Sequence, residues 1–198
     1  MAEPAQLAPR RRERQRLETR NRLFEAALAE FRRAGFAGAQ VTRIAEAAGV
    51  AHGTFFFHFP TKEHVLLELQ RRAEVRIADR LRTLRRKPTP VKAFLQQVID
   101  AIRAEELSAG PDLLREILAL HVRRTDLNVP TPIPEALTEY FVEAGRRGEV
   151  RTDLTAAQLT GIFLASIFGS LLGSVESPSD RRPQLQGVID VFLRGMAP

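Results

Sequence analysis

The stretch from Gln40 to Glu63, QVTRIAEAAGVAHGTFFFHFPTKE, constrains the fold more than any other part of the chain. Its first half has an apolar face at helical spacing: Ile44, Ala45 and Ala48. Gly49 follows directly, where a helix commonly ends in a left-handed residue. A second short helix, at about residues 51–58, has to end before Pro60. Two helices joined by a tight turn that contains glycine form the helix-turn-helix pattern, whose second helix enters the DNA major groove.

The same stretch carries a longer motif. It consists of Val41-Thr42-x-Ile44-Ala45-x-x-Ala48-Gly49-Val50, followed by Gly53-Thr54-Phe55-Phe56-x-His58-Phe59-Pro60-x-Lys62-Glu63. This motif resembles the signature of the TetR family of bacterial transcriptional repressors. With the preceding helix, the resemblance covers roughly the first third of the chain. The remainder is similar to the family only in length and helical pattern.

Charge is divided unevenly along the chain. Residues 1–87 hold 19 Lys and Arg against 10 Asp and Glu, whereas residues 88–198 hold 11 against 14. A basic half that also contains a helix-turn-helix is the electrostatic footprint of phosphate binding. Solvated Arg-rich helix faces are the alternative interpretation, but they leave the motif unexplained.

Several site chemistries are excluded. The chain has no cysteine, and therefore no disulfide, thiolate zinc site or cysteine nucleophile. His52, His58 and His64 are spaced by six and interrupted by Pro60, so we expect no metal site. Without a phosphate-cradling glycine loop or a paired-carboxylate motif, we expect neither an enzyme nor a cofactor. No apolar segment follows the Arg-rich N-terminus, so it is not a secretory signal and we expect a cytoplasmic protein.

The periodicity predicts an all-α chain of about nine helices without a strand. We expect a disordered basic arm at residues 1–12, a three-helix DNA-binding domain at 13–60, a connecting helix at 61–87, and a larger ligand-binding and dimerisation domain at 88–198. The first long helix runs from about Arg12 to Ala34 and is ended by Gly35. Thr155 and Gln158 have the spacing of a capping box at the start of a later helix.

The candidate DNA contacts lie in and beside the motif: Thr42, Arg43, Ala51, His52, Gly53, Thr54, Phe56, Phe57, His58 and Lys62. We expect Thr42 to be an N-cap that also offers a hydroxyl and an N–H to a phosphate. Arg43 is a guanine or phosphate contact, or a solvated side chain. The resemblance makes His58 a phosphate contact. A cation at Lys62 opposes the helix dipole, for which a phosphate partner is a good reason.

Two positions depart from the family pattern. The family usually has Tyr where Phe56 stands and often Ser where Ala51 stands, so two hydrogen-bonding hydroxyls are absent here. The ring at Phe56 remains, which puts one backbone contact in doubt and leaves the fold intact. We expect the neighbouring Phe55 and Phe59 to be core residues.

The segment from Leu154 to Val175 has no charged residue and is long enough to span a membrane. Its Ser, Thr and Gln residues and the absence of flanking aromatic anchors favour a helix buried in a protein interface instead. The resemblance implies that the last two helices pair across a two-fold axis. The candidate interface residues are Gly161, Leu164, Ala165, Phe168, Gly169, Leu172, Ile189 and Phe192.

The resemblance also implies a small-molecule site among the helices between about Pro90 and Gly148. The candidate lining residues, each of which has plain core packing as its alternative, are Phe94, Leu95, Val98, Ile117, His121, Tyr140 and Phe141. The acidic balance of this half favours a cationic or neutral inducer, while fatty acyl compounds stay open. The prediction is a homodimeric, inducer-released repressor of a near-palindromic DNA operator. The alternatives are an activator or ligand-independent regulator with the same fold, and an enzyme.

Overall fold

The computed structural model describes residues 11–123, 132–173 and 181–196. These residues form nine α-helices and no strand, which confirms the predicted all-α class. The helices belong to two compact units, one ending at Leu67 and the other beginning at Glu68. The division falls inside helix α4 (Lys62–Leu84), whereas the sequence analysis placed the boundaries at the two ends of this helix.

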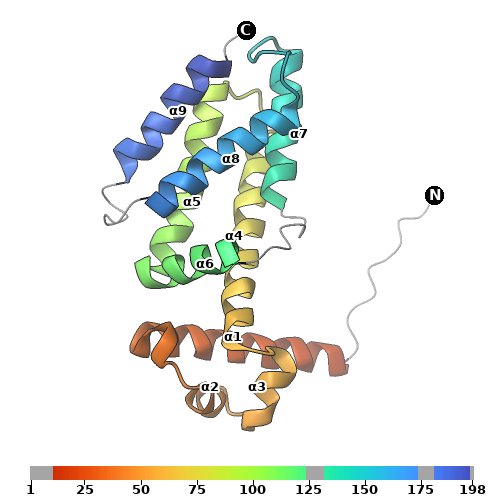
Figure 1. The fold of residues 1–198 in the computed structure, drawn as a ribbon. Helices are drawn as coiled ribbons and strands as arrows, with labels where there is room; N and C mark the ends of the chain where they lie inside the picture. The colour runs from red at the N-terminus through yellow and green to blue at the C-terminus, as the bar shows by residue number, and fades with distance from the viewer. Residues whose placement is uncertain (1–10, 124–131, 174–180, 197–198) are drawn as a thin grey trace, which may run out of the picture. The chain divides into compact units, whose positions relative to one another are not determined.

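The N-terminal unit contains a helix-turn-helix below one long helix. Its elements are α1 (Arg11–Gly38), α2 (Val41–Ala47), α3 (His52–His58) and the first turns of α4. Helix α1 runs over α2, and α2 packs against α3 (Figure 1). The shared core is apolar and consists mainly of Leu23, Phe24, Ala27, Leu28, Phe31, Ile44, Ala45, Phe55 and Phe59. The buried apolar face of α1 therefore meets the predicted apolar face of α2.

Glycines end the first two helices of this unit. Gly35 interrupts α1 at φ 70°, one residue after the predicted end of the helix. Gly49 follows α2 at φ 66°, as expected. There the N–H of Val50 donates to the carbonyl of Ala45, and that of Gly49 to the carbonyl of Glu46, both at 3.0 Å. This pair of bonds is a Schellman motif, which satisfies the last carbonyls of α2 and turns the chain into α3.

The C-terminal unit is built on the rest of α4 and five further helices. These are α5 (Val91–Ala109), α6 (Pro111–Arg123), α7 (Pro132–Arg146), α8 (Ala156–Gly173) and α9 (Arg182–Met196). Helix α8 packs against α7 and α9, and α5 packs against α6 and α9 (Figure 1). One hydrophobic core joins α4, α5, α7, α8 and α9.

Helix α8 starts at the predicted capping box. The N–H of Thr155 donates to Gln158 Oε1 at 2.8 Å, and the N–H of Gln158 donates to Thr155 Oγ1 at 3.2 Å. By length and composition alone α8 is apolar enough to cross a membrane, with a mean hydropathy of 1.6 over 18 residues. One face of the helix enters the core of the unit through Leu159, Phe163, Ile167 and Leu171. The apolar composition of that face is accounted for by core packing.

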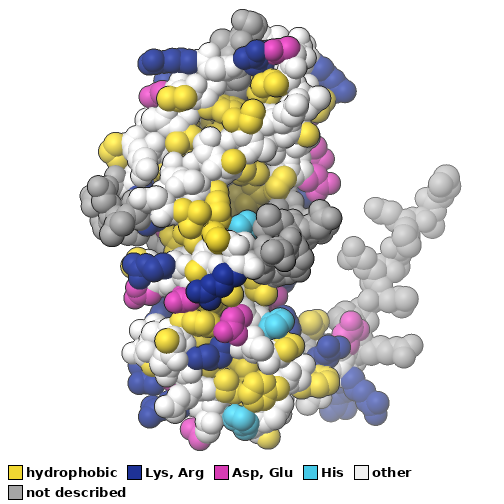
Figure 2. All heavy atoms as spheres, viewed as in Figure 1, with side chains coloured by type: hydrophobic (Ala, Val, Ile, Leu, Met, Phe, Trp, Pro, Cys, Tyr) yellow, Lys and Arg dark blue, Asp and Glu magenta, His cyan; other side chains and the backbone are white. Residues whose placement is uncertain are grey.

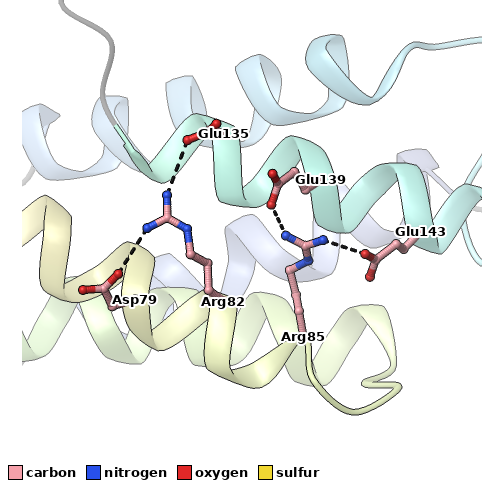
Figure 3. Close-up of polar contacts among 6 residues, drawn as sticks. All are labelled: Asp79, Arg82, Arg85, Glu135, Glu139 and Glu143. Carbon is pink, nitrogen blue, oxygen red and sulfur yellow. Dashed lines mark hydrogen bonds and ion pairs between the residues drawn. The ribbon is translucent and has the colours of Figure 1, made fainter. Parts of the chain in front are cut away.

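Ion pairs connect the C-terminal half of α4 to α7 (Figure 3). Arg82 pairs with Asp79 of its own helix at 3.1 Å and with Glu135 of α7 at 3.4 Å. One turn further on, Arg85 pairs with Glu139 and, at 2.6 Å, with Glu143. The three glutamates are four residues apart and share one face of α7. Each exposed pair contributes only about 0.2–1 kcal/mol, but the series fixes the register of α4 on α7.

Candidate nucleic-acid interface and ligand cavity

One side of the helix-turn-helix is open to solvent. Five of the candidate contacts that lie at the starts of α2 and α3 are exposed: Thr42, Arg43, Ala51, His52 and Gly53. Phe56 and Phe57 on α3 keep 44% and 70% of their surface exposed, and Figure 2 shows hydrophobic side chains reaching the surface of this unit. Thr54 is half-buried between them. This side offers a guanidinium, an imidazole and two aromatic rings, which suit phosphates, base edges and thymine methyls.

Ring contacts hold the exposed aromatics in place. The His52 ring lies edge-on to Phe56 with centroids 5.3 Å apart. The Arg16 guanidinium, on the basic first part of α1, lies 5.5 Å from the centroid of Phe57, within cation–π range. Phe55 and Phe59 are fully buried, as the sequence predicted. Phe55 and Phe59 therefore anchor α3 in the core, whereas Phe56 and Phe57 are exposed on its outer side.

His58 lies elsewhere than expected. The resemblance made it a phosphate contact and the alternative made it a surface imidazole, but its side chain is 92% buried. Burial lowers its pKa, and the positive charges of Arg20 and Arg16 lower the pKa further. Arg20 also donates to the backbone carbonyl of His58. The Phe57 ring lies edge-on to the imidazole, with centroids 5.2 Å apart, and the imidazole is packed inside the unit rather than facing solvent.

The N-cap residue of α2 makes no side-chain cap hydrogen bond. We predicted Thr42 as the N-cap, but the N-cap is Gln40, and Thr42 is the second helical residue. The backbone N–H of Gln40 donates to Glu30 Oε1 at 3.3 Å. The Arg33 guanidinium donates two hydrogen bonds, of 2.7 and 2.8 Å, to the same carboxylate. The Glu30 carboxylate of α1 therefore holds the N-cap residue in place, and Thr42, which lies inside the helix, does not cap it.

Lys62 also has a partner inside the protein. Its ammonium donates to the carbonyls of Phe36, Ala37 and Ala39 at 2.9, 3.2 and 3.0 Å. The sequence suggested a phosphate partner as a good reason for a cation in the first turn of α4. The carbonyls at the end of α1 supply that explanation instead, because they lack intrahelical donors. Tertiary packing over more than 20 residues of sequence creates this contact, and no local pattern could have shown it.

A cavity of about 730 Å³ lies in the C-terminal unit. Its apolar lining comes from α4, α5, α6, α7 and α8 and consists chiefly of Leu69, Ala73, Ile77, Ile102, Leu114, Ile117, Leu118, Ile133, Leu164, Phe168 and Leu171. Its polar lining includes Gln70, Glu74, Arg76, Glu105, Glu106, Ser108 and His121. A volume in this range, mostly apolar with a few polar groups, is typical of small-molecule sites.

Only two of the seven predicted pocket residues, Ile117 and His121, line this cavity. The other five are between 0% and 1% exposed and belong to the core: Phe94, Leu95, Val98, Tyr140 and Phe141. Tyr140 stacks on Phe94 with centroids 3.6 Å apart, and its hydroxyl donates to the Thr89 carbonyl at 2.7 Å. Burial raises the pKa of Tyr140 to about 12. The hydroxyl that we expected to be a polar handle for a ligand is therefore used within the fold.

Helix α4 supplies the part of the cavity that we missed. Leu69, Ala73 and Ile77 of this helix line the cavity beside Gln70 and Glu74. Gln70 Nε2 donates to Glu74 Oε1 at 2.8 Å, an i to i+4 contact on the cavity side of the helix. Burial raises the pKa of Glu74, against the opposing effects of the Gln70 hydrogen bond and the His121 charge. A carboxylate within an apolar stripe was the signal that could have identified this wall.

A second, smaller hollow of about 460 Å³ lies between α8 and α9. Among its lining residues are Ile162 and Ser166 of α8 and Gly187, Val188 and Val191 of α9. We call this the α8–α9 groove. Ile162 is 49% and Val191 73% exposed. Two apolar helices thus present a strip that no other described element covers.

The predicted dimer residues are spread over several surroundings. Gly161, Gly169 and Leu172 are exposed on α8. Leu164, Ala165 and Phe168 face the cavity. Ile189 is fully buried in the core, and Phe192, 8% exposed, joins the core and one wall of the groove. Because α8 has no charged residue on any side, its sequence could not show which side faces the core, the cavity or solvent.

No group of three or more His, Cys, Asp or Glu side chains suited to a metal ion occurs in the part of the chain that the structure describes.

The chain is similar in sequence to known bacterial regulatory proteins. A family model described as "Bacterial regulatory proteins, tetR family" matches residues 23–69, which include the helix-turn-helix. The HTH-type transcriptional regulator CymR of Pseudomonas putida is 34% identical over 96 residues, which cover 48% of this chain and 47% of that protein. The match therefore spans about half the length of that relative. The fatty acid metabolism regulator protein of Bacillus subtilis is 27% identical over 139 residues, covering 67% and 71%.

The fold is shared with a solved structure. FadR of Thermus thermophilus, a TetR family transcriptional repressor in complex with lauroyl-CoA, superimposes with a TM-score of 0.71 over 88% of this chain and 91% of that chain. The two sequences are 24% identical, so the likeness is one of fold.

Proposed function

Because this chain belongs to the TetR family of bacterial transcriptional regulators, we propose that it is a cytoplasmic, ligand-responsive repressor. In this proposal a homodimer binds a near-palindromic DNA operator and is released when a small molecule occupies the cavity. Two copies of α3 enter successive major grooves one helical turn apart, a distance of about 34 Å along the DNA.

The exposed side of the helix-turn-helix carries this proposal. Arg43 and His52 stand at the solvent-facing starts of α2 and α3, beside the exposed rings of Phe56 and Phe57. A surface that combines cations with aromatic rings serves both phosphate and base contacts. The basic excess of residues 1–87 supports the same role through long-range attraction of the DNA polyanion.

The α8–α9 groove supports the homodimer. Its exposed aliphatic residues, Ile162 and Val191, lie beside Gly187, where a second backbone can come close. Burying such a strip against a second copy removes apolar surface from water, which stabilises the dimer by about 25 cal/mol per Å² buried. A two-fold axis at the groove makes the interface self-complementary, as in most homodimers.

Helix α4 supports control by a ligand. Its residues Leu69, Ala73 and Ile77 line the cavity, and the same helix begins at Lys62 in the N-terminal unit. A ligand that binds better to one position of α4 than to another shifts the population toward that position. Release from DNA follows when the favoured position of α4 sets the two recognition helices at a distance that no longer matches the spacing of the operator half-sites.

A mobility-shift titration of DNA flanking the gene, at two salt concentrations, tests the proposal. We expect a discrete shift of one short fragment, with an affinity that falls steeply as salt rises because counterions are released from phosphates. Competition with unrelated DNA of the same length is the control. Diffuse retardation of all fragments alike would contradict operator recognition.

A further inference from the structure

We infer that the cavity selects an apolar molecule carrying one cationic nitrogen, and that the Glu74 carboxylate is its partner. This inference rests on the proposed role of the cavity as the inducer site and names the chemical class of that inducer. It follows from the ion pairing of the cavity wall.

Among the described residues of the wall, every arginine, glutamate and aspartate has an ion-pair partner except Glu74. Arg76 binds Glu105 through two hydrogen bonds of 2.6 and 2.8 Å. Glu106, whose side chain is 1% exposed, pairs with Arg181. Glu74 accepts a hydrogen bond from Gln70, a neutral amide, at 2.8 Å. Among the residues that the structure describes, no arginine or lysine pairs with Glu74. The charge of His121 lowers the pKa of Glu74, but the two described side chains form no ion pair, so the carboxylate can still bind a ligand cation.

The apolar surroundings of Glu74 destabilise its ionised form when no ligand cation is bound. Leu69, Ala73 and Ile77 flank it on α4, and Phe168 of α8 lines the same cavity. Desolvation raises the pKa of Glu74, which means that its apolar surroundings disfavour the ionised carboxylate. A ligand cation restores the lost stabilisation through a charge-assisted hydrogen bond. Gln70 occupies Oε1 only, and no described residue donates to Oε2, which is available to an N–H of the ligand.

Two aromatic groups fit the same ligand. The His121 ring of α6 lies against Phe168 with centroids 4.8 Å apart, and both residues line the cavity. The face of Phe168 can attract a cation, most strongly where water is excluded. The aliphatic remainder of the wall accommodates an alkyl or aryl body, and 730 Å³ is a volume for a drug-sized molecule.

An anionic head fits this wall poorly. A carboxylate or phosphate placed beside Glu74 would meet a like charge. Arg76, the one arginine among the described residues of the lining, is already bound to Glu105. This distinguishes the cavity from a site for fatty acids, although fold likeness links the chain to a protein that binds lauroyl-CoA.

Calorimetric titration of the full-length protein with four probes of equal chain length tests the inference. The probes are dodecylammonium, dodecanol, dodecanoate and lauroyl-CoA, each below its micelle concentration at pH 7. We expect dodecylammonium to bind most tightly. Glu74→Gln keeps the shape of the side chain and should weaken dodecylammonium binding by about 10- to 100-fold, the usual range for a hydrogen bond to a charged group. Binding of dodecanol should not change.

Glu116→Gln is the matched control, because Glu116 lies on α6 without lining the cavity. It should leave all four affinities unchanged, and thermal melts verify that both variants fold. Tighter binding of dodecanoate or lauroyl-CoA, an equal loss for all probes in Glu74→Gln, or no binding of dodecylammonium would each overturn the inference.

The mobility-shift assay separates this inference from the proposed function. Operator binding without any response to dodecylammonium, together with no calorimetric binding, would overturn the ligand class and leave the DNA-binding regulator standing. Glu74-dependent binding of dodecylammonium by a protein that retards no DNA fragment would support the cavity chemistry and overturn the repressor.

Discussion

The Lys62 ammonium donates to the carbonyl oxygen of Phe36 at 2.9 Å and lies 5.2 Å from the centroid of the Phe36 ring. Two more carbonyls of the same chain segment accept hydrogen bonds from this ammonium. A lysine has three N–H donors, so one side chain satisfies three backbone groups that the end of α1 leaves open. Lys62 therefore ties the first turn of α4 to the end of α1.

Replacing Lys62 by methionine keeps the unbranched stem and removes the donors. We expect Lys62→Met to lower the free energy of unfolding by about 1–3 kcal/mol, because buried or half-buried carbonyls lose charged donors. Urea unfolding followed by circular dichroism measures the change. Lys92→Met, at an exposed position of α5, is the control and should be neutral. Unchanged stability with weakened DNA binding would return Lys62 to the role of a phosphate contact.

Glu30 makes the stability depend on acidity. The hydrogen bonds from Arg33 are the main reason that its pKa is lowered from 4.5 to about 2, with a further contribution from the Gln40 N–H. A carboxylate with a depressed pKa stabilises the fold above its unfolded pKa, and this stabilisation is lost as the pH falls through the folded pKa. We expect Glu30→Gln to be less stable than the parent at pH 7, with a difference that shrinks between pH 4.5 and about 2.

Urea unfolding of both proteins at pH 7, 4 and about 2.5 measures this difference. Glu46→Gln, which removes a carboxylate from an exposed position on α2, is the matched control. A gap between parent and Glu30→Gln that stays constant over the whole range would show that the lost interaction is steric rather than ionic.

The helix-turn-helix could be predicted from the sequence because its signals are local. Gly49, with φ 66°, ends α2 at the predicted residue, and Pro60 follows the end of α3. Thr155 and Gln158 form their capping box for the same reason, since both partners lie within one turn. Patterns of this kind depend only on residues a few positions apart.

The cavity and the partners of charged side chains could not be predicted in this way. Apolar periodicity identifies Phe94 and Tyr140 as inward-facing, but it cannot tell a side chain that fills space from one that borders an empty volume. Lys62 and His58 take their roles from α1, which approaches them only in the folded chain. Such positions are set by packing between helices, for which a single sequence carries no local signal.

Arg43 provides a direct test of the DNA-binding surface. It is exposed on α2 next to Thr42. If Arg43 contacts one phosphate, Arg43→Ala should weaken all sequences alike and reduce the slope of log affinity against log salt by about 0.9. If Arg43 contacts a guanine, Arg43→Ala should lose about 1–3 kcal/mol of binding free energy on the operator. The variant should also tolerate a different base at the contacted position. Arg182→Ala, an equal charge change at an exposed position of α9, is the control. Unchanged affinity and slope would remove Arg43 from the interface.

The α8–α9 groove predicts which surface holds the dimer together. Val191 is 73% exposed there, and a two-fold interface would bury it against a second copy. A glutamate in its place would be desolvated without a partner, so we expect Val191→Glu to raise the dimer dissociation constant at least about 100-fold, near 3 kcal/mol. Sedimentation velocity over a range of concentrations measures this constant, and operator affinity should fall with it because a monomer reads only one half-site.

Two further variants make this result specific to the groove. Val142→Glu introduces the same charge at a site on α7 that is 41% exposed, and it should leave the dimer intact. Leu172→Glu alters the exposed part of α8 that the sequence analysis assigned to the interface but that does not line the groove. If Leu172→Glu dissociates the dimer while Val191→Glu does not, the subunits pair through the glycine-bearing side of α8 and the groove is not the interface. Dissociation by Val191→Glu alone places the two-fold axis at α8 and α9, where Ile162 and Val191 of each subunit supply the buried apolar surface.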